Sequence, residues 1–351
     1  MSKNAPFKNI AVIGAGTMGS GIAGQIANSE QEVLLLDIPG KTPNSITEDA
    51  VKKLIRSDPP ALMHKNKANL IKVGNIRDDF NKLANCDLII EAVVERLDIK
   101  KDLYNRINNI VNSKCVITSN TSTIPIKLLV EDMPQSFRER FAITHYFNPV
   151  RFMRLLELVR GEHTKSEIIK KLADYNDRIL GKGVVACNDT PGFLGNRVGV
   201  YALQVGMDEA YKLNLTVEEA DSLMGRPMGI PKTGIFGLYD LIGIDLMSDV
   251  VDTLGTILPD NDDFHKVGTS NIPTAELIKK MIDEGFTGNK GKGGFYRLDE
   301  KENEFYLDIY NNKTVQKSTQ LNEKAKVSAE LLEKGKETLF HLIKNNSNDI
   351  Q

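Results

Sequence analysis

Residues 10–19 read IAVIGAGTMG, a four-residue apolar run followed directly by a turn with glycine at positions 14, 16 and 19. Beyond the turn, apolar side chains recur at every fourth position: Met18, Ile22 and Ile26. That spacing places them on one face of a helix. A buried strand, a glycine-rich turn and a helix in this order are typical of the first unit of a doubly wound, mostly parallel α/β sheet.

Each glycine of the turn has a physical role. Gly14 allows the tight turn, Gly16 lets a pyrophosphate approach the backbone, and Gly19 lets the helix pack closely on the strand. The N–H groups that open the helix, including those of Thr17 and Met18, are free to bind phosphate. The alternative is a glycine turn without a ligand, because this short motif is weak on its own.

The next predicted strand ends in an acidic residue. Asp37 follows the apolar run Val33–Leu36 and lies 18 residues beyond Gly19. Its carboxylate can accept hydrogen bonds from both hydroxyls of a ribose and would repel a 2′-phosphate. The strand, turn, helix and acidic residue occur in the order and at the spacing of a dinucleotide-binding motif. The sequence therefore predicts a dinucleotide site that prefers NAD to NADP.

The chain changes character near residue 187. Before it we expect strands at Ile10–Ile13, Val33–Leu36, Leu88–Ala92, Val116–Ser119, Ala142–Phe147 and Leu155–Val159, and helices at Lys100–Val111 and Ser166–Leu180. After it strand signals are sparse, and helical spacing continues at Thr216–Met224 and Thr274–Glu284. We therefore predict an α/β, Rossmann-like NAD-binding domain over 1–187 and a mainly helical second domain over 188–298. A charged tail, 299–351, would carry one amphipathic helix on Val327, Leu331, Leu332, Leu339 and Leu342.

Composition excludes several classes of protein. A length of 351 residues fits about two domains, and no apolar run approaches the ~18 residues that a membrane span needs. A net charge of −2 argues against sequence-independent binding of nucleic acid. The three dispersed cysteines fit no zinc-ligand spacing, and the first residues lack the apolar core of a signal peptide. We expect a cytoplasmic protein with no metal, nucleic-acid or membrane partner, either complete or part of a longer polypeptide.

A second group of polar residues follows later strands. The run Val116–Ser119 leads into SNTSTI (119–124), at the carboxyl end of a strand, where ligands of such sheets lie. His145 and Glu157 each stand inside an apolar run, and the two runs are joined by an Asn-Pro turn. Neighbouring strands would bring this carboxylate to the imidazole, which suits a general base. A histidine satisfied within the core is the alternative, and spacing alone leaves it open.

These motifs together resemble the L-3-hydroxyacyl-CoA dehydrogenases of fatty-acid β-oxidation. The resemblance is carried by GAGTMG, SNTSTI, HYFNP with Glu157 twelve residues after the histidine, and DTPGFLGNRV, in the family's order over about residues 7–298. The stretch GIPKTGIFGLYDLIGID is closer to the dehydrogenase part of long bacterial fusions with an enoyl-CoA hydratase. The resemblance implies a fatty acyl-CoA substrate bound between two domains, NAD as cofactor, and a homodimer.

The resemblance also assigns roles to residues. It implies that His145 is the catalytic base, oriented by Glu157, that Ser122 bonds to the substrate hydroxyl, and that Asn196 contacts the substrate near its carbonyl. It further implies a set of NAD contacts at Asp37, Glu95, Lys100, Ser122, Asn148 and Lys290. Plainer interpretations stay open: Ser122 as a helix cap, Asn196 as a helix-surface residue, Lys290 as a solvated lysine, and Glu95 with Lys100 as an exposed charge pair.

One segment departs from the family pattern. Where the family commonly has a helical hairpin that touches CoA, this chain carries Asp58-Pro59-Pro60, which precludes one uninterrupted helix. Lys65 and Lys67 are candidates for binding the 3′-phosphate of CoA. Two other functions remain as alternatives: a Rossmann dehydrogenase of a small free hydroxy acid, similar to the crystallin-like sugar-acid enzymes, and an NAD-binding module with a dormant site.

Overall fold

The structure is a computed structural model, and it describes residues 5–228, 232–267, 273–299, 301, 303–316, 330–332 and 334–335. The chain forms two compact units, Met1–Asn196 and Arg197–Gln351. None of the helices in the described ranges combines the length and apolar character that crossing a bilayer demands. The same ranges hold no cluster of three or more His, Cys, Asp or Glu side chains suited to a metal ion.

The first unit is built on an eight-stranded sheet in the order β3-β2-β1-β4-β5-β6-β7-β8. Its strands are β1 (Ile10–Ile13), β2 (Val33–Asp37), β3 (Ile71–Asn75), β4 (Leu88–Glu91), β5 (Val116–Ser119), β6 (Phe141–Tyr146), β7 (Leu155–Arg160) and β8 (Gly183–Cys187). All neighbours are parallel except β6 and β7, which are antiparallel. The strand order reverses beside β1, which is where doubly wound sheets bind ligands.

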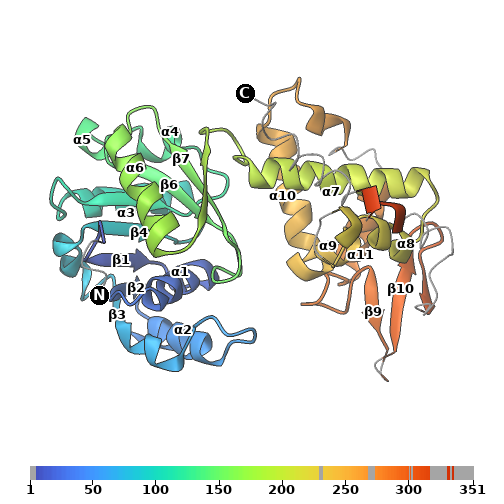
Figure 1. The fold of residues 1–351 in the computed structure, drawn as a ribbon, viewed down its shortest axis with the longest axis horizontal. Coiled ribbons are helices and arrows are strands. Elements are labelled where there is room, and N and C mark those ends of the chain that lie inside the picture. The colour runs from blue at the N-terminus through green and yellow to red at the C-terminus, as the bar shows by residue number, and fades with distance from the viewer. Residues whose placement is uncertain are drawn as a thin grey trace. The chain divides into compact units, whose positions relative to one another are not determined.

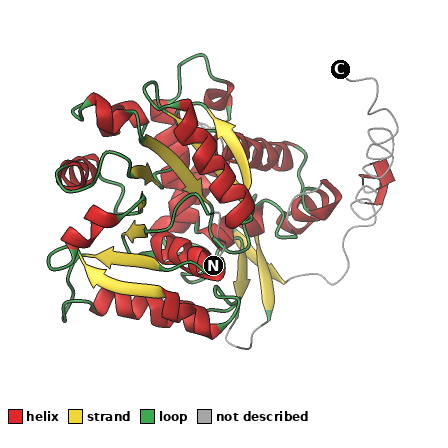
Figure 2. Cartoon of the chain, turned by 60° about the vertical axis from the view of Figure 1, so that its left-hand side comes forward, coloured by secondary structure: helices red, strands yellow, loops and turns green. Residues whose placement is uncertain are grey.

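Helices cover both faces of this sheet (Figures 1 and 2). One core contains α1 (Thr17–Asn28), α2 (Ser45–Arg56) and α6 (Ser166–Asp174), and the other contains α3 (Leu97–Asn108), α4 (Ile126–Val130) and α5 (Gln135–Arg138). Successive residues of β1 enter opposite cores, Ile10 and Val12 one and Ala11 and Ile13 the other. The central strands are therefore buried on both sides, which explains their uninterrupted apolar sequences.

The strand predictions hold for the centre of the sheet and miss its two edges. Each of the six predicted strands is present to within one residue at each end, whereas β3 and β8 are absent from the prediction. Both are edge strands and are only partly buried. Lys72 interrupts the apolar sequence of β3, whereas β8 has a short apolar run, Val184–Cys187, that the prediction did not assign to a strand. The predicted helix at Lys100–Val111 begins three residues earlier, at Leu97. The predicted helix at Ser166–Leu180 ends as α-helix at Asp174 and continues as a π-helical turn, Tyr175–Ile179.

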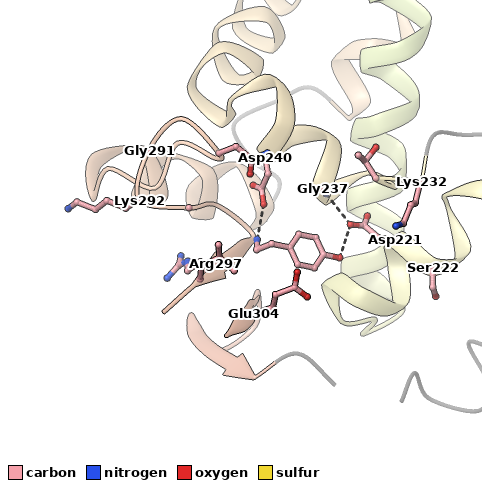
Figure 3. A pocket seen from close by; sticks show the side chains of 14 residues that line it. Asp221, Ser222, Lys232, Gly237, Asp240, Gly291, Lys292, Arg297 and Glu304 are labelled. Atoms are coloured by element: carbon pink, nitrogen blue, oxygen red, sulfur yellow. Dashed lines mark hydrogen bonds between the residues drawn. The ribbon is translucent and has the colours of Figure 1, made fainter. Parts of the chain in front are cut away.

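The second unit is mainly helical. Its helices are α7 (Gly195–Lys212), α8 (Val217–Leu223), α9 (Phe236–Ile242), α10 (Ile244–Ile257) and α11 (Pro273–Asp283), with α7 starting at the boundary between the units. Two buried carboxylates, Asp221 and Asp240, line a pocket in this unit (Figure 3). Their hydrogen bonds hold the end of the glycine-rich segment, near residue 296, against the helices. Asp221 accepts the N–H groups that open α9 and the hydroxyl of Tyr296, and Asp240 accepts the N–H groups of Phe295 and Tyr296.

The segment from residue 296 onward forms a small sheet that the sequence did not predict. Strands β9 (Tyr296–Leu298), β10 (Glu304–Asp308) and β11 (Lys313–Gln316) form an antiparallel sheet, and Leu307 and Ile309 are buried in the core of the second unit. These strands are short and half exposed, so charged residues mask their alternation. Of the predicted amphipathic helix, Leu331 and Leu332 are helical and exposed, and its other three apolar positions lie outside the described residues.

Candidate active site

The glycine turn between β1 and α1 leaves no room for side chains at two of its positions. Gly14 has a φ of +103°, and a Cβ there would lie 2.3 Å from the carbonyl oxygen of Ala92. A Cβ on Gly19 would lie 1.8 Å from the carbonyl oxygen of Gly14. At Gly16, in contrast, a Cβ would meet nothing within 4 Å. The fold thus requires glycine at 14 and 19, whereas the space at 16 is left open.

The carboxylate of Asp37 is held beside this turn. Its oxygens accept hydrogen bonds from the N–H groups of Ala15, at 2.5 Å, and Ile38, at 2.6 Å. The first-turn N–H groups of an α-helix such as α1 have no partner within the helix and can bind an anion. Together the open backbone, the free donors and the acidic residue fit the pyrophosphate and ribose of a dinucleotide.

The structure pairs His145 with Glu157 directly. They are opposite residues of the antiparallel strands β6 and β7, and His145 Nδ1 lies 2.6 Å from Glu157 Oε2. Both side chains are buried. The other carboxylate oxygen accepts the N–H groups of Leu194, at 2.9 Å, and Gly195, at 2.6 Å. The predicted proximity of these two residues is therefore confirmed.

The donors around Glu157 keep it ionised. Burial raises the pKa of this carboxyl, but the hydrogen bond from His145 and those from the Gly195 and Leu194 N–H groups outweigh it, so the pKa lies below its usual value. A carboxylate has no proton to donate, so the His145 Nδ1 must carry one. That tautomer leaves Nε2 as a proton acceptor, with the imidazole packed against the ring of Phe147 at 4.5 Å between centroids. The arrangement is that of a general base.

Glu95 organises the loop after β5, where Ser122 lies. It accepts hydrogen bonds from the hydroxyls of Thr121 and Thr123 and from the N–H of Ser122 at 3.3 Å. Burial raises its pKa, but the charge of Lys100 and the hydroxyl donors outweigh it, and the pKa is lowered overall. Asn120 in the same loop accepts the N–H of Tyr146, next to His145. This loop is therefore tied both to Glu95 and to the strand of the base.

Lys100 is not part of an exposed charge pair. Its side chain is 1% exposed, and its ammonium lies 2.7 Å from Glu91 and 3.2 Å from Glu95. Glu91, which the sequence analysis did not select, also accepts the hydroxyls of Tyr104 and Ser119. The signal was present, because Glu91 ends the apolar run of β4 as Glu157 interrupts that of β7. A carboxylate in such a run needs several donors if it is to be buried.

The remaining predicted site residues are more dispersed. Asn148 is exposed in the segment between β6 and β7, and Asn196 is half buried in the first turn of α7. Lys290 belongs to the second unit, where its ammonium lies 2.6 Å from Asp245. Of the two CoA candidates, Lys67 is paired with Glu30, whereas Lys65 is exposed. Helix α2 ends at Arg56, before the two prolines.

The glycine turn, the acidic residue after the next strand and the histidine–carboxylate pair are together typical of one class of protein, the NAD-dependent Rossmann dehydrogenases. The comparisons specify the family within that class. Residues 9–190 match the NAD binding domain of 3-hydroxyacyl-CoA dehydrogenase, and residues 192–298 match its C-terminal domain. The chain belongs to the 3-hydroxyacyl-CoA dehydrogenase family.

Relatives and solved structures agree with this assignment. The chain is 44% identical over 295 residues to a putative fatty acid oxidation complex trifunctional enzyme of Rickettsia prowazekii, covering 83% of this chain but only 40% of that protein. It is 39% identical over 299 residues to a probable 3-hydroxyacyl-CoA dehydrogenase of Deinococcus radiodurans, covering 84% of each. The crystal structure of FadB2 from M. tuberculosis superposes with a TM-score of 0.69 at 28% identity, covering 84% of this chain and 99% of that one.

Proposed function

We propose that this chain catalyses the NAD-dependent oxidation of an L-3-hydroxyacyl-CoA to the 3-ketoacyl-CoA, as in fatty-acid β-oxidation. The observation that carries the proposal is the buried pair formed by His145 and Glu157, with Nδ1 2.6 Å from the carboxylate. It supplies a base in the same unit as the dinucleotide turn, within a chain of this family. The same residues support the reverse reaction, in which the protonated imidazole acts as the acid.

Each side chain has a distinct part in the mechanism. The Nε2 of His145 takes the proton from the C3 hydroxyl, and the negative charge of Glu157 stabilises the imidazolium that forms. Ser122 and Asn196 bind the substrate oxygens, so that C3 is held in one orientation. When bound, NAD accepts the hydride that leaves C3.

The same arrangement supports a set of proposed cofactor contacts. We assign the pyrophosphate to the open backbone at Gly16 and the N–H groups of Thr17, Met18 and Gly19, and the adenosine ribose to Asp37. Glu95, Ser122 and Asn148 supply polar atoms beyond the adjoining strands, and Lys290 stays a candidate on the strength of the family resemblance alone. Since Lys100 is buried between Glu91 and Glu95, it acts on the cofactor through Glu95.

For CoA, the two lysine candidates are no longer equal. The Lys67 ammonium is already engaged by Glu30, and its side chain is 18% exposed. Lys65 is exposed, and we assign it the 3′-phosphate of CoA. Lys67 would have to exchange Glu30 for the phosphate, so we give it the lesser part.

We also propose a cytoplasmic homodimer. Large apolar side chains of α9 and α10 are exposed on the second unit: Leu241, Ile242, Leu246 and Ile257. Adjacent exposed residues of this size are typical of a surface that a partner covers. The three cysteines are free, as expected for a reducing compartment. Light scattering of the purified protein tests the dimer.

The direct test of the activity is loss of NADH absorbance with acetoacetyl-CoA, in the wild type and in His145→Gln. We expect turnover in the wild type and none in the variant. A wild type that is inactive on 3-ketoacyl-CoAs of every chain length would refute the proposal. Activity on L-gulonate without CoA would favour a free hydroxy acid as substrate, and tight NADH binding without any turnover would indicate a dormant site.

A further inference from the structure

Lys182, just before β8, is a buried cation without an acidic partner. Its side chain is 2% exposed, and no ion pair joins it to a carboxylate of the described residues. Its ammonium donates to two main-chain carbonyls, those of Val150 and, at 3.0 Å, Met153. It also lies 5.9 Å from the ring centroid of Tyr146. Burying an unpaired charge is costly, so this lysine is expected to have a particular task.

The two carbonyls belong to segment 147–154, which joins β6 to β7. These are the strands that carry His145 and Glu157. At its start the segment packs against the beginning of α7, because a Cβ on Gly195 would lie 2.9 Å from the ring of Phe147. In its middle Val150 packs on the cofactor helix α1, where a Cβ on Gly21 would lie 2.9 Å from the Val150 side chain. The segment therefore touches both parts of the proposed site.

Two further contacts anchor the segment. Arg151 donates to the carbonyl of Pro60 at 2.5 Å and thereby ties the segment to the loop that follows α2. The carbonyl of Arg154 accepts the N–H of Gly183, the residue after Lys182, at 2.7 Å. Held in this way, the segment leaves Phe152 46% exposed and Met153 39% exposed. Two large apolar side chains exposed together, in the segment that joins the strands of the base and its carboxylate, are suited to contact an apolar ligand.

We propose that Lys182 is a positioning residue for the dehydrogenase reaction, which holds segment 147–154 so that Phe152 and Met153 contact the acyl chain of the substrate. The acyl contact rests on the proposed function, whereas the holding of the segment does not. Lys182 binds the carbonyl of Met153 itself. Contacts at Val150 and Arg151, before Met153, and at Arg154, after it, leave the segment little freedom. The lysine thus acts on the substrate through the segment and not by touching it.

The charge of Lys182 makes this contact dependent on pH. Burial alone lowers the pKa of Lys182 to about 8. The groups facing it do not compete: burial raises the pKa of Tyr146 well above its usual value, Asn176 does not titrate, and the rest are carbonyls. Arg151 and Arg154 are the charged residues of the segment itself. Above pH 8 the amine loses a proton and binds the two carbonyls less strongly, so the segment loosens.

The test compares Lys182→Met, which keeps the apolar stem and removes the cation, with Lys171→Met as the matched control. Lys171 also lies over an aromatic ring, that of Phe7, but away from the segment. For a long-chain 3-ketoacyl-CoA we expect KM to rise roughly ten-fold in K182M, as for one lost hydrogen bond to a charged group. Turnover, KM for NADH and the kinetics of K171M should stay within about two-fold of wild type. In wild type KM should rise above pH 8, and in K182M it should not.

Hydrogen exchange provides a measurement that needs no activity. At pH 7 the peptide covering 147–154 should exchange faster in K182M than in wild type or K171M, by about the same ten-fold. Equal exchange and equal KM would overturn the proposal. If the wild type turns over no 3-ketoacyl-CoA, the proposed function fails with the acyl contact, and exchange alone decides whether Lys182 holds the segment. If K182M does not fold, a wild-type KM that is constant from pH 7 to 9.5 overturns the proposal.

Discussion

Replacing Glu157 by glutamine separates the charge of this residue from its shape. The Oε1 position accepts the N–H groups of Leu194 and Gly195, and only an oxygen can do so. The glutamine NH₂ group must therefore face Nδ1 of His145, now 2.6 Å from Oε2. It can bond there only if Nδ1 carries no proton, which moves the proton to Nε2. The substitution thus removes both the negative charge and the tautomer that accepts the substrate proton.

The size of the effect can be worked from the same geometry. With Nδ1 and Oε2 in contact, the charge centres of imidazolium and carboxylate lie about 4 Å apart, worth about 4 kcal/mol at an effective dielectric constant of about 20. A hydrogen bond to a charged group is worth about 1.5–3 kcal/mol. A loss of about 2–4 kcal/mol in stabilising the protonated base lowers kcat by about 30-fold to about 1,000-fold. The displaced tautomer adds to this loss.

The assay is NADH oxidation with acetoacetyl-CoA, together with NADH affinity from fluorescence titration. We expect kcat to fall by the factor given above and the NADH dissociation constant to stay within about two-fold, because Glu157 supports the base and not the cofactor. Glu139→Gln, which removes a half-buried carboxylate paired with Lys165, is the control and should retain full activity. Equal losses of kcat and NADH affinity would refute the reasoning, since they would mean that Glu157 chiefly maintains the fold.

Four other substitutions test the cofactor turn and the second unit. In Gly16→Ala the new Cβ meets open space, so the melting temperature should stay unchanged while NADH binding weakens at least about ten-fold. In Gly19→Ala the new Cβ would lie 1.8 Å from a carbonyl oxygen, so the melting temperature should fall. Asp37→Ser should raise KM for NADH roughly ten- to a hundred-fold and reduce the preference over NADPH; an unchanged preference would contradict the assignment. Burial raises the pKa of Asp240 to about 6, so the native state holds a proton that the unfolded chain has released. Wild-type stability contributed by this group should therefore fall as the pH rises from about 4 to about 6, and urea unfolding of Asp240→Asn should lack that fall.

The sequence was most informative where one residue type is dictated by a local physical need. The strand, the glycine turn and Asp37 could be predicted because the backbone contacts of Gly14 and Gly19 admit no side chain. The pairing of His145 with Glu157 could be predicted because both interrupt apolar runs joined by a short turn. In each case the pattern lies within a few residues or between adjacent strands, so little knowledge of tertiary packing was needed.

The parts that could not be predicted depend on distant contacts. The edge strands β3 and β8 pair with one neighbour each and are only partly buried. The sequence of β3 is interrupted by Lys72, and the short apolar run of β8, Val184–Cys187, does not by itself show that it pairs with β7. Lys182 stands between two glycines and looks like a turn residue. Only the fold shows that carbonyls about 30 residues earlier surround its ammonium. Nothing in the local sequence distinguishes such a lysine from a solvated one.

The two buried carboxylates at the carboxyl edge of the sheet show why similar sequence signals lead to different roles. Glu91 and Glu157 both stand in apolar strands, and each has donors on both of its oxygens. The donors of Glu91 are an ammonium, two hydroxyls and a main-chain N–H, none of which exchanges a proton with substrate. Glu157 alone faces an imidazole, whose second nitrogen is free to accept one. Glu157 therefore differs from Glu91 in having a titratable donor beside it, and not in its burial. That donor gives Glu157 a part in the reaction, whereas Glu91 has a supporting role.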